Sequence, residues 1–125
     1  MDVRLQHVQL AAPPGCEEAA RRFFGGLLKL PEIGKPEPLR ARGGVWFALG
    51  DGQELHIGVE EPFEPARKAH AAFEIGIDDI DGVAGLLAGA GEKVEWDDAL
   101  AGYRRFYTAD PWGNRLEVLA RVDGG

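Results

Sequence analysis

The two halves of this chain carry the same pattern. Residues 113–118, GNRLEV, match residues 52–57, GQELHI, at an offset of 61 positions, and FYT at 106–108 matches VWF at 45–47 at the same offset. Upstream, HAAFEI at 70–75 matches HVQLAA at 7–12 at an offset of 63 positions, and an amphipathic helical pattern follows each. A loop that differs by two residues between the halves reconciles the two offsets. A chain that repeats in this way is expected to fold into two similar modules of about sixty residues.

The repeat also aligns side chains that can bind metal. It places His7 and His70 at equivalent positions and His56 and Glu117 at equivalent positions, so that all three histidines belong to it. Imidazole nitrogen and carboxylate oxygen suit a borderline divalent ion such as zinc, nickel, iron(II), manganese or cobalt. We therefore predict one divalent metal site with the ligands His7, His56, His70 and Glu117. Such a site can polarise a substrate oxygen or acidify a bound water.

Two of these positions have plainer alternatives. Glu117 lies between Leu116 and Val118, and a Glu in a strand is most often exposed on the wet face. In the strand expected over Gln53–Val59, Glu54 and His56 share one face, which leaves open which of them faces the site. The Leu-X-Ile/Val frame that His56 shares with Glu117 favours His56.

Length and charge narrow the class of protein. The 125 residues are expected to form one domain, residues 1–125, made of two repeats at about 3–59 and 70–121. A net charge of −7 argues against nucleic acid or an anionic membrane as partner, because both require basic patches. No apolar run is long enough to cross a bilayer, and the N-terminus lacks the pattern of a signal peptide. Cys16 is the single cysteine, so a reducing, cytoplasmic location is expected.

The predicted elements follow the chain in the same order in each half. Helices are expected over Glu17–Lys29, weakened by Gly25-Gly26, and over Asp79–Ala90, capped by Asp78 and stopped by Gly91. Residues 30–42 are rich in proline and allow at most a short edge strand. Residues 60–68 are expected to be the linker between the halves, and Asp110–Gly113 a tight turn. The remaining segments are predicted strands: Val3–Ala11, Val45–Leu49, Gln53–Val59, His70–Ile77, Val94–Asp97 and the two that flank the turn.

Three further residues are candidates for substrate binding. Trp46 and Tyr107 occupy matched positions in the two halves and could line a pocket, although an aromatic on a sheet is more often packing. Arg105, beside Tyr107, could meet an anionic group of the substrate. The alternative for Arg104 and Arg105 is a pair of solvated cations on an edge strand.

Taken together, these motifs resemble the vicinal oxygen chelate superfamily, which includes glyoxalase I, bleomycin resistance proteins, fosfomycin resistance thiol transferases and extradiol dioxygenases. The resemblance rests on the His-bearing strands at His7 and His70, and on the DPxGN turn at residues 110–114 followed by Glu117. It implies an α+β fold of two βαβββ modules that form a cupped mixed β-sheet with helices on the outside. It also implies that His7, His56, His70 and Glu117 hold a divalent metal and that Glu117 either binds the metal or acts as base.

The resemblance implies a small enzyme that chelates an oxygen-bearing substrate on the metal, as a lyase, isomerase or thiol transferase. The sequence departs from individual members: Gln9 stands where the fosfomycin transferases usually have Thr, and His56 where glyoxalase I usually has Glu. The chain is also short for an extradiol dioxygenase. The alternative function is a metal-free protein that binds and sequesters a small molecule, such as an antibiotic. Small members of the superfamily suggest a homodimer, in which His7 and His56 of one chain face His70 and Glu117 of the other.

Overall fold

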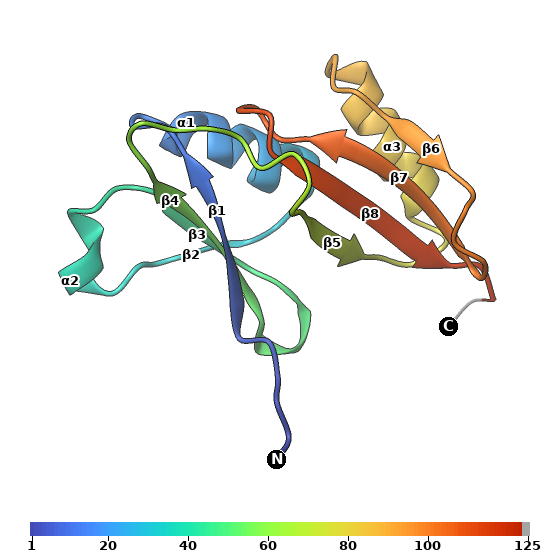
Figure 1. Ribbon diagram of the computed structural model, residues 1–125, viewed down its shortest axis with the longest axis horizontal. Helices are drawn as coiled ribbons and strands as arrows, with labels where there is room; N and C mark the ends of the chain where they lie inside the picture. Colours follow the sequence, from blue (N-terminus) through green and yellow to red (C-terminus); the bar gives the residue numbers. More distant parts are fainter. Residues whose placement is uncertain (124–125) are drawn as a thin grey trace. The chain divides into compact units, whose positions relative to one another are not determined.

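The computed structural model describes residues 1–123 and divides the chain into two compact units, residues 1–65 and residues 66 onward. Each unit contains one four-stranded mixed sheet and few helices (Figure 1). The fold is therefore α+β with two βαβββ-like modules, and this confirms the predicted fold class. No helix among the described residues is long and apolar enough to cross a membrane.

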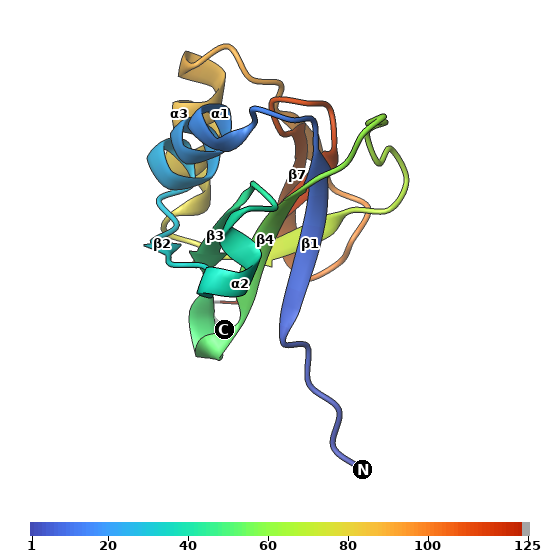
Figure 2. The same cartoon turned by 90° about the vertical axis from the view of Figure 1, so that its left-hand side faces the viewer.

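The sheet of the first unit has the strand order β1-β4-β3-β2, with β1 parallel to β4 and the other pairs antiparallel. Its strands are β1 (His7–Ala12), β2 (Glu32–Ile33), β3 (Val45–Ala48) and β4 (Glu54–Val59). Alternate residues bury one face of this sheet: Leu10, Ala12, Val45, Phe47, Leu55 and Ile57. A helix formed by α1 (Glu17–Ala20) and the π-helix η1 (Arg21–Leu27) follows β1 (Figure 2). Its Phe23 and Phe24 belong to the same core.

The sheet of the second unit has the order β5-β8-β7-β6, again with the first pair parallel and the others antiparallel. Its strands are β5 (Ala71–Glu74), β6 (Glu95–Asp97), β7 (Tyr103–Ala109) and β8 (Arg115–Arg121). Helix α3 (Ile80–Gly89) packs against β8, as Figure 1 shows. The shared core consists of Ile80, Ala84, Leu87, Phe106, Leu116, Val118 and Ala120.

The strand registers of the two units are equivalent. In the first unit His56 lies opposite Gln9 on one side and Trp46 on the other. In the second unit Glu117 lies opposite Ala72 and Tyr107. These pairs keep the offsets that the sequence repeat has, so the repeat extends to the backbone pairing.

Several boundaries differ from the predictions. Strand β1 begins at His7 rather than Val3, because its partner β4 begins at Glu54, whose N–H donates to Gln6 O at the end of the ladder. Strand β5 covers Ala71–Glu74 and leaves His70 just outside it. The first helix ends at Leu27, and its Leu28 N–H donates to Phe23 O across the wider turn of a π-helix.

Two local predictions were wrong. Residues 37–40 form a one-turn helix, α2 (Glu37–Arg40), within the segment expected to hold at most an edge strand. Pro38 lies in its first turn, where its fixed φ suits a helix and its missing N–H costs nothing. The cap residue of α3 is Asp79 rather than Asp78, and its side chain makes no capping hydrogen bond. Gly91, which has φ of 84°, follows the end of α3 as predicted.

Candidate functional site

Glu117 is a buried carboxylate in the middle of a sheet. It is only 5% exposed, whereas its neighbours Leu116 and Val118 point to the apolar core on the other face. The interpretation of Glu117 as an exposed strand residue is therefore wrong. A buried carboxylate is costly unless it is paired, so its partners indicate what this face of the sheet does.

His70 is the first partner of Glu117. Its Nε2 lies 3.0 Å from Glu117 Oε1. Its Nδ1 lies 2.9 Å from the carbonyl oxygen of Lys68, which can only accept a hydrogen bond, so Nδ1 carries a proton and donates it. This contact fixes the ring and leaves Nε2 as the nitrogen that faces Glu117, which is the usual arrangement for a histidine that binds metal.

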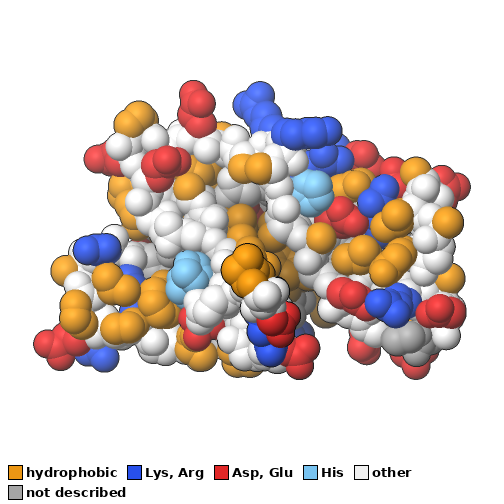
Figure 3. Space-filling model, turned by 60° about the horizontal axis from the view of Figure 1, so that its bottom comes forward, with side chains coloured by type: hydrophobic (Ala, Val, Ile, Leu, Met, Phe, Trp, Pro, Cys, Tyr) orange, Lys and Arg blue, Asp and Glu red, His pale blue; other side chains and the backbone are white. Residues whose placement is uncertain are grey.

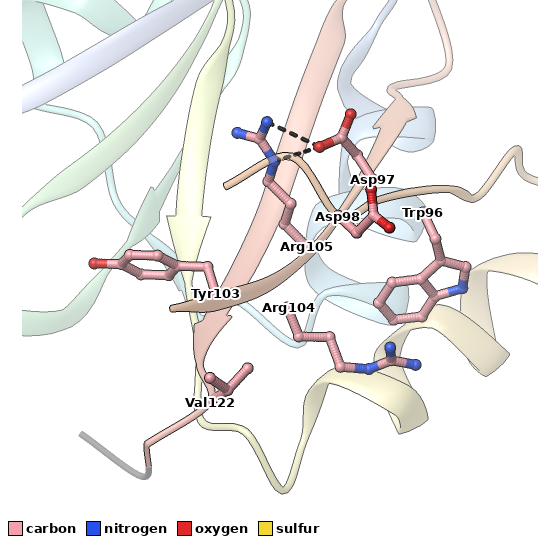
Figure 4. Close-up of a pocket in the computed structure, with 7 residues that line it drawn as sticks. All are labelled: Trp96, Asp97, Asp98, Tyr103, Arg104, Arg105 and Val122. Carbon is pink, nitrogen blue, oxygen red and sulfur yellow. Dashed lines mark hydrogen bonds and ion pairs between the residues drawn. The ribbon is translucent and has the colours of Figure 1, made fainter. Parts of the chain in front are cut away.

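Arg105 is the second partner of Glu117. Its NH1 donates to Glu117 Oε2 at 3.2 Å, and its Nε and NH2 donate to Asp97 Oδ1 at 3.1 and 3.0 Å. Figure 4 shows Arg105 directed at Asp97, with the Arg104 side chain placed apart from it, beside Trp96. The hydrogen bond to Asp97, followed by that to Glu117, raises the pKa of Arg105 above its ordinary value. The pKa of Asp97 is lowered by the Ala99 N–H and then by Arg105.

Arg105 is thus not a solvated cation on an edge strand. Strand β7 lies between β8 and β6, and the Arg105 side chain is 16% exposed. Arg104 fits the solvated alternative better, because it is 45% exposed and pairs with Asp81 of α3 at 2.7 Å.

The predicted tight turn anchors the strand that carries Glu117. Asp110 Oδ1 accepts hydrogen bonds from the backbone N–H groups of Trp112 and Asn114, and Asp110 Oδ2 accepts one from Asn114 Nδ2 at 2.7 Å. Asn114 Oδ1 accepts one from the Ala66 N–H at 2.8 Å, and the Arg115 N–H donates to Ala66 O. Burial raises the pKa of Asp110. The DPxGN motif therefore ties the start of β8 to the segment that leads to His70.

The first unit holds a stack of three rings. His56 lies between Trp46, with ring centres 3.7 Å apart, and His7, with ring centres 4.3 Å apart. His7 Nδ1 lies 2.6 Å from Gln6 Oε1, so it donates there and leaves Nε2 free for another contact. His56 Nε2 lies 2.8 Å from Glu54 Oε1. Both Glu54 and His56 therefore face this side of the sheet, and the contact between them keeps both as candidates.

Imidazole nitrogens and a carboxylate oxygen have the right chemistry for a divalent ion. Each unit gathers two of the four predicted ligands. The pairs are His7 with His56 and His70 with Glu117. Among residues 1–123, no three His, Cys, Asp or Glu side chains are grouped as a metal site. The residues thus fit a metal as two half-sets, one in each unit.

The remaining predicted residues lie on the same faces as these pairs. Tyr107 meets the His70 ring in a T-shaped arrangement with 5.9 Å between ring centres, whereas Trp46 stacks flat on His56. Figure 3 shows histidine side chains at the surface, among acidic, basic and hydrophobic ones. The sequence did not indicate a role for Asp97, which holds Arg105, or for Arg115. The guanidinium carbon of Arg115 lies 4.1 Å from the centre of the Tyr107 ring. The spacing of Arg115 two residues before Glu117 was the available signal, because it places both on one face.

Comparison with solved structures gives close matches along nearly the whole chain. A protein of Bacillus anthracis assigned to the glyoxalase family is 46% identical, with 97% of each chain covered and a TM-score of 0.90. Oxidase ChaP-H2 is 27% identical, with 97% of this chain and 95% of that chain covered and a TM-score of 0.74. A glyoxalase/dioxygenase from Nostoc punctiforme is 22% identical, with 94% and 90% covered and a TM-score of 0.79. No protein-family model matches the chain, and no curated protein matches it.

Proposed function

Because the chain belongs to the glyoxalase/bleomycin resistance/dioxygenase superfamily, we propose that it is a metal-dependent enzyme that chelates a small oxygen-bearing substrate. The observation that supports this most directly is the contact between His70 and the buried carboxylate of Glu117. A fold that needed only packing at this position would have an apolar residue there, as it has at Leu116 and Val118 on the opposite face. The pair keeps its polar atoms on the side of the sheet away from the core.

The proposed ligands are His7, His56, His70 and Glu117. In His7 and His70 the Nδ1 atom already donates a hydrogen bond, so Nε2 is the coordinating nitrogen. The divalent ion, when bound, would polarise adjacent oxygens of the substrate and stabilise negative charge on them.

Glu117 has a second possible role as the base of the reaction. Arg105 binds Oε2 and so holds the carboxylate in one orientation, with Oε1 directed to His70. A carboxylate fixed by one oxygen can bind a metal, or accept a proton from the substrate, with the other. Arg105 has further N–H donors and can also contact an anionic group of the substrate.

The reaction we favour is that of a lyase, an isomerase or a thiol transferase, with Trp46 and Tyr107 as walls of the substrate site. Oxygen chemistry also fits a chain of this length, because ChaP-H2, a protein of similar size, is named an oxidase. A metal-free binding protein is the second candidate. It is favoured by the observation that His56 and Glu117 already have hydrogen-bond partners in Glu54 and His70.

Metal titration tests the proposal. Zinc, nickel or manganese should raise the thermal midpoint of the untagged apo protein in proportion to the logarithm of ion concentration. Glu117→Gln should weaken this response, whereas Glu74→Gln, which changes an exposed carboxylate of β5, should not. Comparing Glu54→Gln with His56→Gln identifies which of the two binds the ion. No response to any of these ions would favour the metal-free binding protein.

We further propose that the four ligands come together in a homodimer. Each unit has only two of them, so a complete set requires two units, and exchange would place His7 and His56 of one chain with His70 and Glu117 of its partner. Inactive His7→Ala and Glu117→Gln proteins, unfolded and refolded together, would then regain one intact site in each mixed dimer. Random mixing restores about a quarter of all sites. If each site lies within one chain, the mixture recovers no activity.

A further inference from the structure

A pocket of about 350 Å³ lies beside Tyr107 in the second unit. Three cations, Arg67, Lys93 and Arg115, and the carboxylate of Glu95 contribute to its lining. Lys93 Nζ lies 3.1 Å from Glu95 Oε2, so these two charges neutralise each other. Within residues 1–123, neither Arg67 nor Arg115 forms an ion pair with a carboxylate. Two arginines without such a pair therefore share one pocket, in a chain whose net charge is −7.

Among residues 1–123, the guanidinium group of Arg115 is held in place by a ring contact and not by hydrogen bonds. Its guanidinium carbon lies 4.1 Å from the centre of the Tyr107 ring, and the side chain is partly buried on β8. Stacking on an aromatic face fixes the plane of a guanidinium group and leaves the N–H groups along its edge available. These donors suit a planar carboxylate or a phosphonate oxygen pair, which the guanidinium edge can bind with two hydrogen bonds.

Tyr107, which lines the pocket, is also a neighbour of both His70 and Glu117. Arg115 and Glu117 are two residues apart on β8 and share a face, and Tyr107 lies opposite Glu117 on β7. The Arg115 guanidinium carbon lies 4.1 Å from the centre of the Tyr107 ring, and the His70 ring meets the same ring in a T-shaped arrangement at 5.9 Å between centres. One small molecule can therefore contact the pair and the pocket together.

We infer that this pocket is an anion subsite, in which Arg115 and Arg67 bind a carboxylate or phosphonate group at the end of the substrate remote from its adjacent oxygens. The inference rests on the proposed function, because the same substrate would reach His70 and Glu117. It names a substrate class: a small α-oxygenated acid with a second anionic group, rather than a neutral catechol or aldehyde.

The first experiment needs no metal and so stands apart from the proposed function. Inorganic phosphate is titrated into the full-length, ¹⁵N-labelled apo protein, and the Arg side-chain Nε–H and backbone signals are followed by NMR. Saturable shifts are expected at Arg115 and Tyr107, with affinity at least about tenfold lower in Arg115→Gln. Arg121→Gln is the matched control, since Arg121 lies on the same strand but is exposed and pairs with Glu74. Equal affinity in Arg115→Gln and wild type would mean an adventitious ion only and would overturn the subsite.

The second experiment compares two probes that differ only at the remote end. α-Ketoglutarate and α-ketovalerate present the same adjacent oxygens, but only the former has a distal carboxylate. In calorimetry on the zinc-loaded protein, α-ketoglutarate should bind about 10- to 100-fold more tightly. The preference should disappear in Arg115→Gln and persist in Arg121→Gln. Equal binding of both probes by wild type overturns the inference.

Two further outcomes distinguish a carboxylate from a phosphonate ligand, and the anion subsite from the proposed metal chelation. The phosphonate analogue of α-ketoglutarate shows whether a carboxylate or a phosphonate fits better, and tighter binding of either one supports an anion subsite. Phosphate binding that depends on Arg115, together with no effect of zinc on either keto acid, supports the subsite and counts against the proposed metal chelation.

Discussion

Removal of the Asn114 side chain should destabilise the second unit strongly. Asn114 is 1% exposed and joins two parts of the chain, since it donates to Asp110 and accepts from the Ala66 N–H. A hydrogen bond to a charged group contributes about 1.5–3 kcal/mol and a neutral one about 0.5–1.5 kcal/mol. Asn114→Ala should therefore lower the free energy of unfolding by about 2–4 kcal/mol.

The repeat supplies a matched control for this substitution. Gln53 follows Gly52 as Asn114 follows Gly113, but the hydrogen bonds found at Gln53 are those of its backbone. Gln53→Ala should change the stability by no more than about 0.5 kcal/mol. Urea denaturation gives the free energy of unfolding of each variant. The Arg115 amide donates to Ala66 O, so its native-state hydrogen exchange reports on the stability of the second unit alone. A loss below about 1 kcal/mol, or one equal to that of the control, would refute the view that this motif anchors β8.

Three other predictions concern backbone space, pH and the ring stack. Gly44→Ala should lower the free energy of unfolding by more than about 2 kcal/mol, because a Cβ there would lie 2.0 Å from the carbonyl oxygen of Ile57 in β4. Gly15 has a similar φ but open space around it, so Gly15→Ala should cost about 1 kcal/mol, and thermal denaturation compares the two variants. Burial raises the pKa of Asp110 in the folded state above its ordinary 3.8. Wild type should therefore gain stability relative to Asp110→Asn as the pH falls from the folded-state pKa to the ordinary one, and lose it again as the pH rises. Urea denaturation across this pH range measures the difference. Trp46→Leu removes the ring stacked on His56 and should weaken zinc binding about tenfold in calorimetry, while an unchanged affinity would show that the stack does not orient the imidazole.

The faces of the strands could be predicted from the sequence because side chains alternate with a period of two. By this rule, His7, His56 and Glu117 each lie on the face opposite that of their sequence neighbours, and in the structure those neighbouring faces form the core. The repeat added the register, since Gln9 opposite His56 and Ala72 opposite Glu117 keep the sequence offset of 63 against 61 positions.

Contacts that depend on neighbouring strands could not be predicted from the sequence. Arg105 lies opposite Leu119 and reaches Glu117 diagonally, and it is held by Asp97 of the next strand. No local pattern reveals such a contact before the pairing is known. The start of β1 was missed for a similar reason, because Val3 and Leu5 alternate like strand residues but lack a partner strand.

The equivalence of the two registers has an evolutionary consequence. It is what duplication and fusion of one ancestral gene segment would produce, since chance similarity would not preserve both strand pairing and side-chain position. A separate ancestral module would have supplied the same two side chains twice, so any change would have appeared in both halves at once. Fusion removes that constraint. One half can then hold an imidazole at His56 while the other holds a carboxylate at Glu117, and each position can be selected for its own role.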